Sequence, residues 1–287
     1  MRNRVVVTKA EDLTLEKLIP IVDDYRQIQP SKSPLCIIKY GPPGSGKSSA
    51  DALLEKLFDV NLNQFAKIDK DAPLIAIDEF RKGSIEIIKK YPGLRYKEQP
   101  VQKKVVEFQE KLLSTKDTDG LSITDKIPIV LQRAFDYNFN ILWETTCQSS
   151  GSQQLMDHVF KTIPSIYRII VLFPIISLKT AKQRVLNRAN AHLQQDPPYY
   201  RPVPQAQVSK AHTNSYNYFT NNIVPKVLDG TIYQLFCYNN EVDPRTTRKS
   251  RYRRLAPGWQ FGINSAGVHS IVKNARTSRK KRRHIVE

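Results

Sequence analysis

Short apolar runs alternate with amphipathic segments along most of the chain. The apolar runs have the length and continuous hydrophobicity of buried strands, and the segments between them repeat apolar residues at helical spacing. The predicted strands span 35–40, then either 65–71 or 73–81, and then 140–146, 167–173 and 231–236. The predicted helices span 49–58, 84–140 with breaks at 92–93, 117–120 and Pro128, then 152–162, 177–190 and 205–228. Strands that alternate with helices indicate a three-layer α/β fold around a mostly parallel sheet.

A glycine-rich segment follows the first predicted strand directly and leads into a helix. It reads GPPGSGKS at 41–48, which matches the phosphate-loop pattern G-x-x-x-x-G-K-S in the strand–loop–helix context that the pattern requires. The glycines let the backbone direct N–H groups at phosphate oxygens, and the helix N-terminus adds partial positive charge. Lys47 is expected to reach the β- and γ-phosphates, and the Ser48 hydroxyl is expected to bind Mg²⁺. The predicted nucleotide-binding residues are Gly41, Pro42, Pro43, Gly44, Ser45, Gly46, Lys47, Ser48 and Ser49.

Acidic residues stand where the second strand stops, whichever of the two candidate segments forms it. Asp69 and Asp71 end the earlier segment, and Asp78 lies near the end of the later one. The carboxyl ends of parallel strands line the ligand crevice. A carboxylate there can hold Mg²⁺ through water or accept a proton from an attacking hydroxyl. The alternative is that these acids only cap the following helix, and the sequence leaves open which of the three is catalytic.

Glu144 and Thr145 end the strand predicted at 140–146. They are expected to reach the same crevice as Lys47, with Glu144 assisting at the metal ion or at the substrate.

Three arginines late in the chain are candidates for stabilising the transferred phosphoryl group. Arg184 and Arg188 are four residues apart in the helix predicted over 177–190, so they lie on one face. Arg201 follows on a proline-stiffened loop at 196–204. Arginines that close over a γ-phosphate neutralise the charge that develops in the transition state. The alternative for Arg184 and Arg188 is a solvated helix face.

The formal net charge of +18 is concentrated at the C-terminal end. Residues 245–287 hold thirteen Lys or Arg and one acidic residue, so they carry +12 and leave +6 for the rest. Such an extension attracts phosphate backbones, although it is also typical of a solvated tail, and the basic run at 279–283 fits a nuclear localisation signal. We therefore expect an N-terminal helical segment (1–34), one kinase-like domain (35–240) and a flexible basic tail (241–287).

The three cysteines, Cys36, Cys147 and Cys237, form no metal-binding or disulfide pattern and look like small core residues in a reducing compartment. No apolar run approaches the ~20 residues of a membrane span, and the N-terminus does not resemble a signal peptide. We expect a cytoplasmic protein, or a nuclear one if the host cell has a nucleus.

Several stretches together resemble the zeta-toxin family of P-loop kinases, which are relatives of the nucleoside-monophosphate kinases. They are GPPGSGKSS at 41–49, IDKD at 68–71 or IDEFR at 77–81, ILWETT at 141–146, TAKQRVLNR at 180–188 and YYRPVP at 199–204. The resemblance covers residues 35–236, and the phosphate loop is its most specific part.

The resemblance implies transfer of the γ-phosphoryl group of ATP to a hydroxyl, and family members act on an amino-sugar nucleotide. The family pattern has one catalytic Asp after the second strand. In this chain the spacing from Lys47 matches Asp69 and Asp71, whereas the residue pattern matches Asp78. Thr145 stands where the family usually has Gly.

These observations predict an ATP-dependent phosphotransferase that acts on a small hydroxyl-bearing acceptor such as a sugar nucleotide. One alternative is a polynucleotide kinase or another nucleic-acid-associated NTPase, since the basic extension also carries Tyr252 and Trp259, on which bases can stack. A second alternative is a non-catalytic nucleotide-binding structural protein, which the predicted acids and arginines argue against.

Overall fold

A computed structural model describes residues 7–22, 28–69, 72–91, 98–196, 198–241, 260–264 and 269–272. The strands are β1 (Leu35–Tyr40), β2 (Ala66–Asp69), β3 (Ile141–Thr145), β4 (Arg168–Ile175), β5 (Gln234–Asn239), β6 (Gln260–Asn264) and β7 (His269–Val272). The helices are α1 (Leu15–Val22), α2 (Asp51–Phe58), α3 (Ala72–Ala76), α4 (Asp78–Lys89), α5 (Gln99–Ser114), α6 (Ile123–Asp136), α7 (Ser150–Thr162), α8 (Leu178–Leu193), α9 (Gln205–Tyr218) and α10 (Val224–Leu228).

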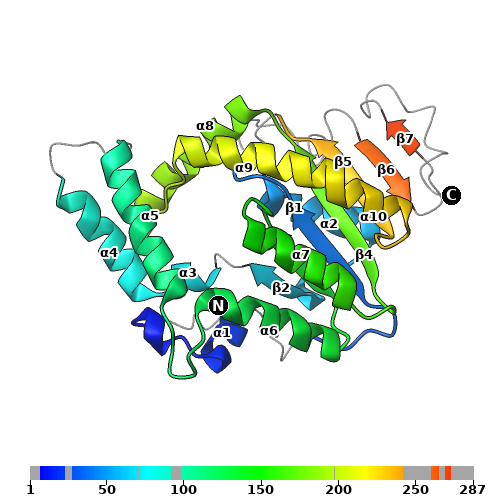
Figure 1. Cartoon of the computed structure of the whole chain (residues 1–287), viewed down its shortest axis with the longest axis horizontal. Coiled ribbons are helices and arrows are strands. Elements are labelled where there is room, and N and C mark those ends of the chain that lie inside the picture. The colour runs from blue at the N-terminus through cyan, green and yellow to red at the C-terminus, as the bar shows by residue number, and fades with distance from the viewer. Residues whose placement is uncertain are drawn as a thin grey trace.

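The described strands form one sheet in the order β2-β3-β1-β4-β5-β6-β7, and its first five strands are parallel (Figure 1). Alternate residues of β1 face opposite layers. Cys36, Ile38 and Tyr40 belong to the larger core cluster, which α6 and α7 share, whereas Ile37 packs with Leu54 of α2. Both faces of the sheet are therefore buried, which explains the continuous hydrophobicity of β1. The predicted three-layer P-loop fold is confirmed.

The earlier of the two candidate segments forms the second strand. Residues 66–69 pair in parallel with β3, whereas 73–81 forms most of α3 and the beginning of α4. Between these helices, Ile77 makes a single parallel bridge with Val7. The apolar run at 73–77 therefore belongs to a short helix and one isolated bridge. A short apolar run has no periodicity that distinguishes a buried helix from a buried strand.

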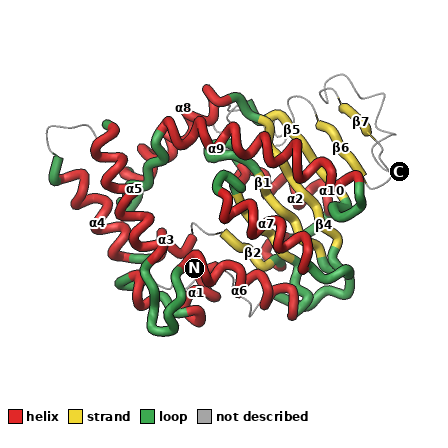
Figure 2. Tube along the Cα trace, viewed as in Figure 1, coloured by secondary structure: helices red, strands yellow, loops and turns green. Residues whose placement is uncertain are grey.

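A helical arm, defined as α3, α4 and α5, lies beside the sheet (Figures 1 and 2). Its two long helices pack closely, because a Cβ at Gly83 of α4 would lie 2.6 Å from the ring of Phe108 of α5. A small buried cluster of Val105, Ala189 and Tyr200 joins α5 to α8 and to the loop after it. The arm is therefore attached to the arginine-bearing helix.

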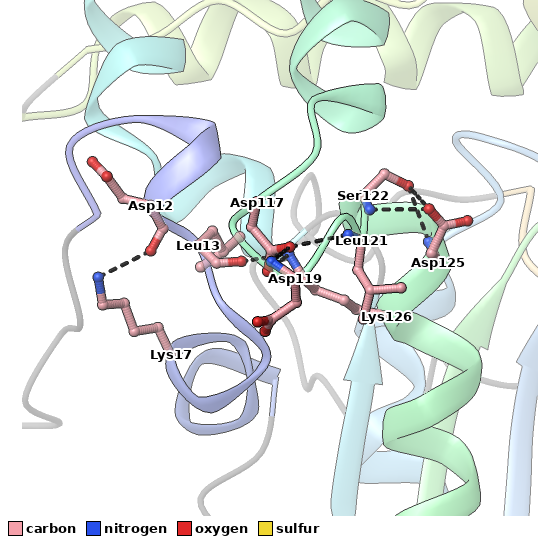
Figure 3. Close-up of polar contacts among 9 residues, drawn as sticks. All are labelled: Asp12, Leu13, Lys17, Asp117, Asp119, Leu121, Ser122, Asp125 and Lys126. Atoms are coloured by element: carbon pink, nitrogen blue, oxygen red, sulfur yellow. Dashed lines mark hydrogen bonds and ion pairs between the residues drawn. The ribbon is translucent and has the colours of Figure 1, made fainter.

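The N-terminal segment is fixed to the start of α6 by a buried ion pair (Figure 3). Lys126 Nζ lies 2.9 Å from Asp117 Oδ2 and donates to the carbonyl of Leu13 at 2.5 Å, and neither ionised side chain is exposed. Asp117 also accepts the backbone N–H of Leu121 at 3.0 Å. Ser122 forms a capping box that begins α6. We call Lys126, Asp117 and the Leu13 carbonyl the anchor pair.

After β5, the strands β6 and β7 extend the sheet in antiparallel fashion. The rest of 242–287 lies outside the described residues, so the expectation of a flexible basic tail stays a prediction. All three cysteines are buried thiols. Within the described ranges, no helix has both the length and the apolar character needed to cross a bilayer.

Candidate functional site

The phosphate loop at 41–48 joins β1 to a short helical turn, Lys47–Ala50, that continues into α2. Gly44 and Gly46 have left-handed φ values of 78° and 85°, which glycine adopts without steric cost. A Cβ at Gly44 would lie 2.4 Å from the carbonyl oxygen of Ala181 in α8. The loop backbone therefore lies directly against the arginine-bearing helix, and only glycine permits this approach.

Lys47 is buried and folds back over the loop. Its Nζ donates to the carbonyl of Gly41 at 2.9 Å and to that of Pro42 at 3.2 Å. The nearby Ser45 Oγ is buried and makes no hydrogen bond with another described residue, while its carbonyl accepts a bond from Asn240 Nδ2 at 2.7 Å. A phosphate oxygen would give the Ser45 hydroxyl an acceptor, so the loop fits the group that its sequence predicts.

A network of charges lies beside Lys47, and we call it the loop network. Lys39 Nζ contacts Asp51 Oδ1 at 2.8 Å and Glu144 Oε2 at 3.2 Å, and Ser48 Oγ donates to Glu144 at 3.2 Å. Burial lowers the pKa of Lys39, but Glu144 and Asp51 together raise that pKa more, so the group stays an ammonium. The network thus holds two carboxylates next to the hydroxyl predicted to bind Mg²⁺.

The oxygen atoms of this network suit Mg²⁺. This ion keeps several waters and is usually bound through one or two protein oxygens plus substrate phosphates. The described residues contain no cluster of three or more His, Cys, Asp or Glu that could hold a metal ion by itself. Ser48 and Glu144 are the residues that could hold the ion.

The structure separates the candidate aspartates. Asp69 ends β2 in register with Glu144 on β3, which is itself in register with Lys39 on β1. Residues paired in this way lie roughly 5 Å apart and point to the same face of the sheet. Asp78 instead begins α4, where its carboxylate lies 3.5 Å from Lys82 Nζ. Asp71 lies outside the described residues.

Thr145 does not share the position of Glu144, although the sequence suggested that both reach the crevice. Successive residues of a strand point to opposite faces, so the Thr145 side chain is buried on the other face, where its hydroxyl lies 3.9 Å from Cys147 Sγ. Its carbonyl accepts the N–H of Gly41 at 3.3 Å. Thr145 therefore contacts the phosphate loop through its backbone.

Arg184 is 8% exposed, so it does not lie on a solvated helix face. It belongs to α8, one turn after Ala181. Burial raises the pKa of the Tyr238 hydroxyl at the end of β5, and Arg184 lowers it, which indicates that the guanidinium lies close to that tyrosine. Glu241 fixes the start of α8 by accepting hydrogen bonds from the hydroxyls of Ser177 and Thr180 at 3.0 and 2.8 Å.

The charges of Arg188 and Arg201 both act on His192. Burial, and then the positive charges of Arg188 and Arg201, together lower the pKa of His192 to about 4. The imidazole stacks on the ring of Tyr199, with centroids 4.5 Å apart. The next residue, Tyr200, donates its N–H to Ser84 Oγ of α4 at 3.0 Å. The loop that carries Arg201 is thereby attached to the helical arm.

Sequence reasoning missed several residues of this site. Lys39 was the only charge inside an otherwise apolar strand, and that anomaly was the available signal. Asp51 and Asn240 carried no signal, because a half-exposed acid at a helix start and an Asn after a strand are common. Their contacts with Lys39 and Ser45 depend on how distant segments pack.

No protein-family model and no curated protein matches the sequence. Similar solved structures include one from the PezAT chromosomal toxin–antitoxin system of Streptococcus pneumoniae, with 14% identity and a TM-score of 0.49 over 79% of this chain and 75% of that one. The AvrRxo1-ORF1:AvrRxo1-ORF2 complex with sulphate ions has 13% identity and a TM-score of 0.46 over 92% and 70%. A deoxyadenosine kinase from M. mycoides with bound dCTP has 16% identity and a TM-score of 0.32 over 73% and 93%.

Because every one of these TM-scores is below 0.5, the similarities carry no argument about the fold or the activity. The strand order and the phosphate loop establish that fold on their own. The chain therefore has a three-layer P-loop fold, and the zeta-toxin family and the P-loop kinases are what its sequence resembles.

Proposed function

We propose that this protein transfers the γ-phosphoryl group of ATP to a hydroxyl of a small acceptor such as a sugar nucleotide. The proposal rests mainly on the loop network beside Lys47. There, Ser48 Oγ lies 3.2 Å from one oxygen of the Glu144 carboxylate, and Lys39 Nζ lies 3.2 Å from the other. A phosphate-binding loop, a buried ammonium and adjacent carboxylate oxygens are the parts that phosphoryl transfer requires.

The donor is held by the loop. Loop N–H groups and the Lys47 ammonium would bind the phosphates, and the Ser45 hydroxyl would donate to a phosphate oxygen. Ser48 and Glu144 would hold Mg²⁺, which neutralises charge on the β- and γ-phosphates when it is bound. Lys39 orients Glu144 through their 3.2 Å contact.

Asp69 is the aspartate that we assign as general base. It stands in register with Glu144 on the neighbouring strand, whereas Asp78 is paired with Lys82 in the helical arm. The acceptor hydroxyl would give its proton to the Asp69 carboxylate as its oxygen bonds to the γ-phosphorus. The bond between that phosphorus and the bridging oxygen breaks, and ADP leaves with the electron pair.

The three arginines would stabilise the transferred group. Arg184 is buried on the helix that touches Gly44, and the charges of Arg188 and Arg201 both act on His192. Their fixed positive charges would neutralise the negative charge that spreads over the phosphoryl oxygens in the transition state.

The test is transfer from γ-labelled ATP with Mg²⁺, comparing the wild type with Lys47→Ala and with Lys103→Ala, an exposed lysine of α5 as control. The acceptors are sugar nucleotides, nucleosides, and DNA and RNA with 5′-hydroxyl ends. We expect label on a small acceptor with wild type and control, and none with Lys47→Ala. Release of free phosphate alone, or no turnover, would contradict the kinase proposal.

A second candidate is a nucleic-acid kinase, which the +12 charge of residues 245–287 favours. Truncation at 245 would also remove β6 and β7 from the sheet, so substitution of the basic residues at 279–283 by Gln is the cleaner test. Loss of label on oligonucleotides, with transfer to small acceptors retained, would support this candidate.

A further inference from the structure

A hollow lies between α7 and α9, the helix that follows the arginine loop. Its volume is about 390 Å³, which is within the range of small-molecule pockets. Every side chain that lines it is polar and uncharged. We call it the amide pocket, and its lining residues are Gln148, Ser150, Gln153, Asn214, Asn217, Tyr218, Asn221 and Asn222.

The inner part of the amide pocket is held rigidly by hydrogen bonds. Asn214 Nδ2 donates to the carbonyl of Gln148 at 2.9 Å, and Gln153 Nε2 donates to that of Cys147 at 3.0 Å. The buried Tyr218 hydroxyl donates to Asp157 Oδ1 at 2.7 Å. These contacts fix the side chains of Asn214, Gln153 and Tyr218, so this part of the pocket is formed before a ligand binds.

One acceptor in the amide pocket has no partner. Gln148 Oε1 is buried and makes no hydrogen bond with any other described residue. Buried acceptors without a donor are uncommon in native proteins, and each one needs an explanation. If the Gln148 side chain turns toward the pocket, a ligand hydroxyl there would supply the donor that Oε1 lacks.

The opposite wall of the pocket contains an irregular helical turn. Residues Phe219–Ile223 form a π-helix between α9 and α10, and Asn221 and Asn222 belong to it. Such turns are uncommon, cost hydrogen-bond geometry and occur frequently at functional sites. Here the turn places two further amides on the pocket, beside Asn217 from the last part of α9.

We infer that the amide pocket binds an uncharged ligand with several hydroxyl groups, such as a monosaccharide ring. Hydroxyls both donate and accept, so they match amide groups, which offer both functions. No cation lines the pocket to attract a phosphate, and the Asp157 carboxylate behind Tyr218 disfavours an anion. The ligand is either a free sugar or the sugar part of a larger molecule, and its binding does not depend on phosphoryl transfer.

The test is saturation-transfer NMR on the full chain with three neutral probes, D-glucose, N-acetyl-D-glucosamine and myo-inositol, and with glucose 6-phosphate as the charged counterpart. We expect saturable binding of a neutral probe, and a tenfold or greater loss of affinity in Gln148→Leu and in Asn217→Leu. The second variant changes an exposed residue of the pocket rim, so it tests the pocket even if the first fails to fold. Gln132→Leu, an exposed amide on α6, is the matched control and should bind like the wild type.

Two outcomes would overturn the inference. One is no saturable binding of any neutral probe, or binding that both pocket variants retain in full. The other is binding of glucose 6-phosphate alone that Lys47→Ala abolishes, because this would assign the sugar phosphate to the phosphate loop. If a neutral probe binds, the same measurement with a sugar nucleotide shows whether the pocket takes a free sugar or the sugar part of a larger molecule. Loss of its signal in the pocket variants with Lys47→Ala unaffected would mean that the sugar moiety enters the amide pocket.

Discussion

Among the described residues, Lys126 and Lys39 are buried lysines that form ion pairs, and the two pairs differ in how exposed their carboxylates are. In the anchor pair, Lys126 and Asp117 are both fully buried, and their partners are parts of the fold (Figure 3). In the loop network, Lys39 is 6% exposed, but Glu144 and Asp51 are 21% and 40% exposed. Lys39 is therefore buried, while the two carboxylates that it contacts remain accessible to solvent.

The difference separates a structural role from a chemical one. Both networks carry the cost of removing a charge from water, which an ion pair only partly offsets. The anchor pair connects the N-terminal segment to α6 and offers no atom to a ligand. The loop network keeps carboxylate oxygens accessible beside Ser48, so its charges remain available for a metal ion or a substrate.

The largest expected effect comes from breaking the anchor pair. Asp117→Ala leaves the Lys126 ammonium buried without a carboxylate, which should cost about 3–5 kcal/mol of unfolding free energy. A chain of this size should lose on the order of 10 °C in melting temperature. Scanning calorimetry measures this loss, and Asp119→Ala, which changes an exposed acid in the same turn, is the control. An unchanged melting temperature would mean that the pair does not hold the segment.

Breaking the loop network should affect activity more than stability. Glu144→Gln should lower kcat by ~10²–10³, a loss typical of removing one electrostatic group from a site. Its melting temperature should change little, because Lys39 keeps Asp51 at 2.8 Å. Steady-state kinetics and calorimetry on the same samples test this, with Glu86→Gln of α4 as an exposed control. A loss of stability without a loss of kcat would place Glu144 with the structural residues.

The two described aspartates, Asp69 and Asp78, should differ in their effect on kcat. Asp69→Asn should lower kcat by about 10², the lower end of the contribution of a general base, and should remove the acidic limb of the pH–rate profile. Asp78→Asn breaks only the 3.5 Å pair with Lys82 and should leave kcat within about twofold, as expected for an exposed ion pair. The reverse result would assign the role of base to Asp78.

The smallest effect concerns His192, whose pKa of about 4 lies below its ordinary value of 6.5. The unfolded chain therefore binds a proton between these values that the folded protein does not bind, so stability is full above pH 6.5 and falls as the pH decreases toward 4. After allowance for the partial exposure of the ring, the loss between pH 7 and 5 should be about 1 kcal/mol. His192→Gln should remove this pH dependence in urea unfolding, whereas His158→Gln, an exposed histidine of α7, should keep it. Equal slopes in all three proteins would show that His192 titrates normally.

Local patterns predicted much of the fold because strands and helices follow from the periodicity of a few neighbouring residues. The strands β1, β3 and β4 lie where continuous apolar runs predicted them, whereas β5 begins and ends three residues later than the run at 231–236. Pro128 was expected to break a helix, but α6 continues through it. The helix starts at a complete capping box and buries several apolar residues, and these contacts offset the loss of one backbone hydrogen bond.

The phosphate loop was predicted as a unit because one contiguous motif encodes it. The rest of the site depends on register between strands that are far apart in the sequence. The sequence alone did not distinguish Asp69 from Asp78. In the structure, strand pairing places Asp69 in register with Glu144, whereas Asp78 follows Ile77, which forms a bridge with Val7. Thr145 lies on the opposite face from its neighbour for the same reason, since pairing decides which side of a strand faces the site.

The contact between Gly44 and Ala181 has a consequence for how this sequence can vary. The loop backbone and α8 meet without space for a single methyl group, and Asn240 and Glu241 fix the loop and the start of the same helix from adjacent positions. A change on one side of this seam can be accommodated only by a compensating change on the other. We therefore expect substitutions in the phosphate loop and in α8 to be coupled, so that a change in one segment destabilises the fold unless the other segment changes with it.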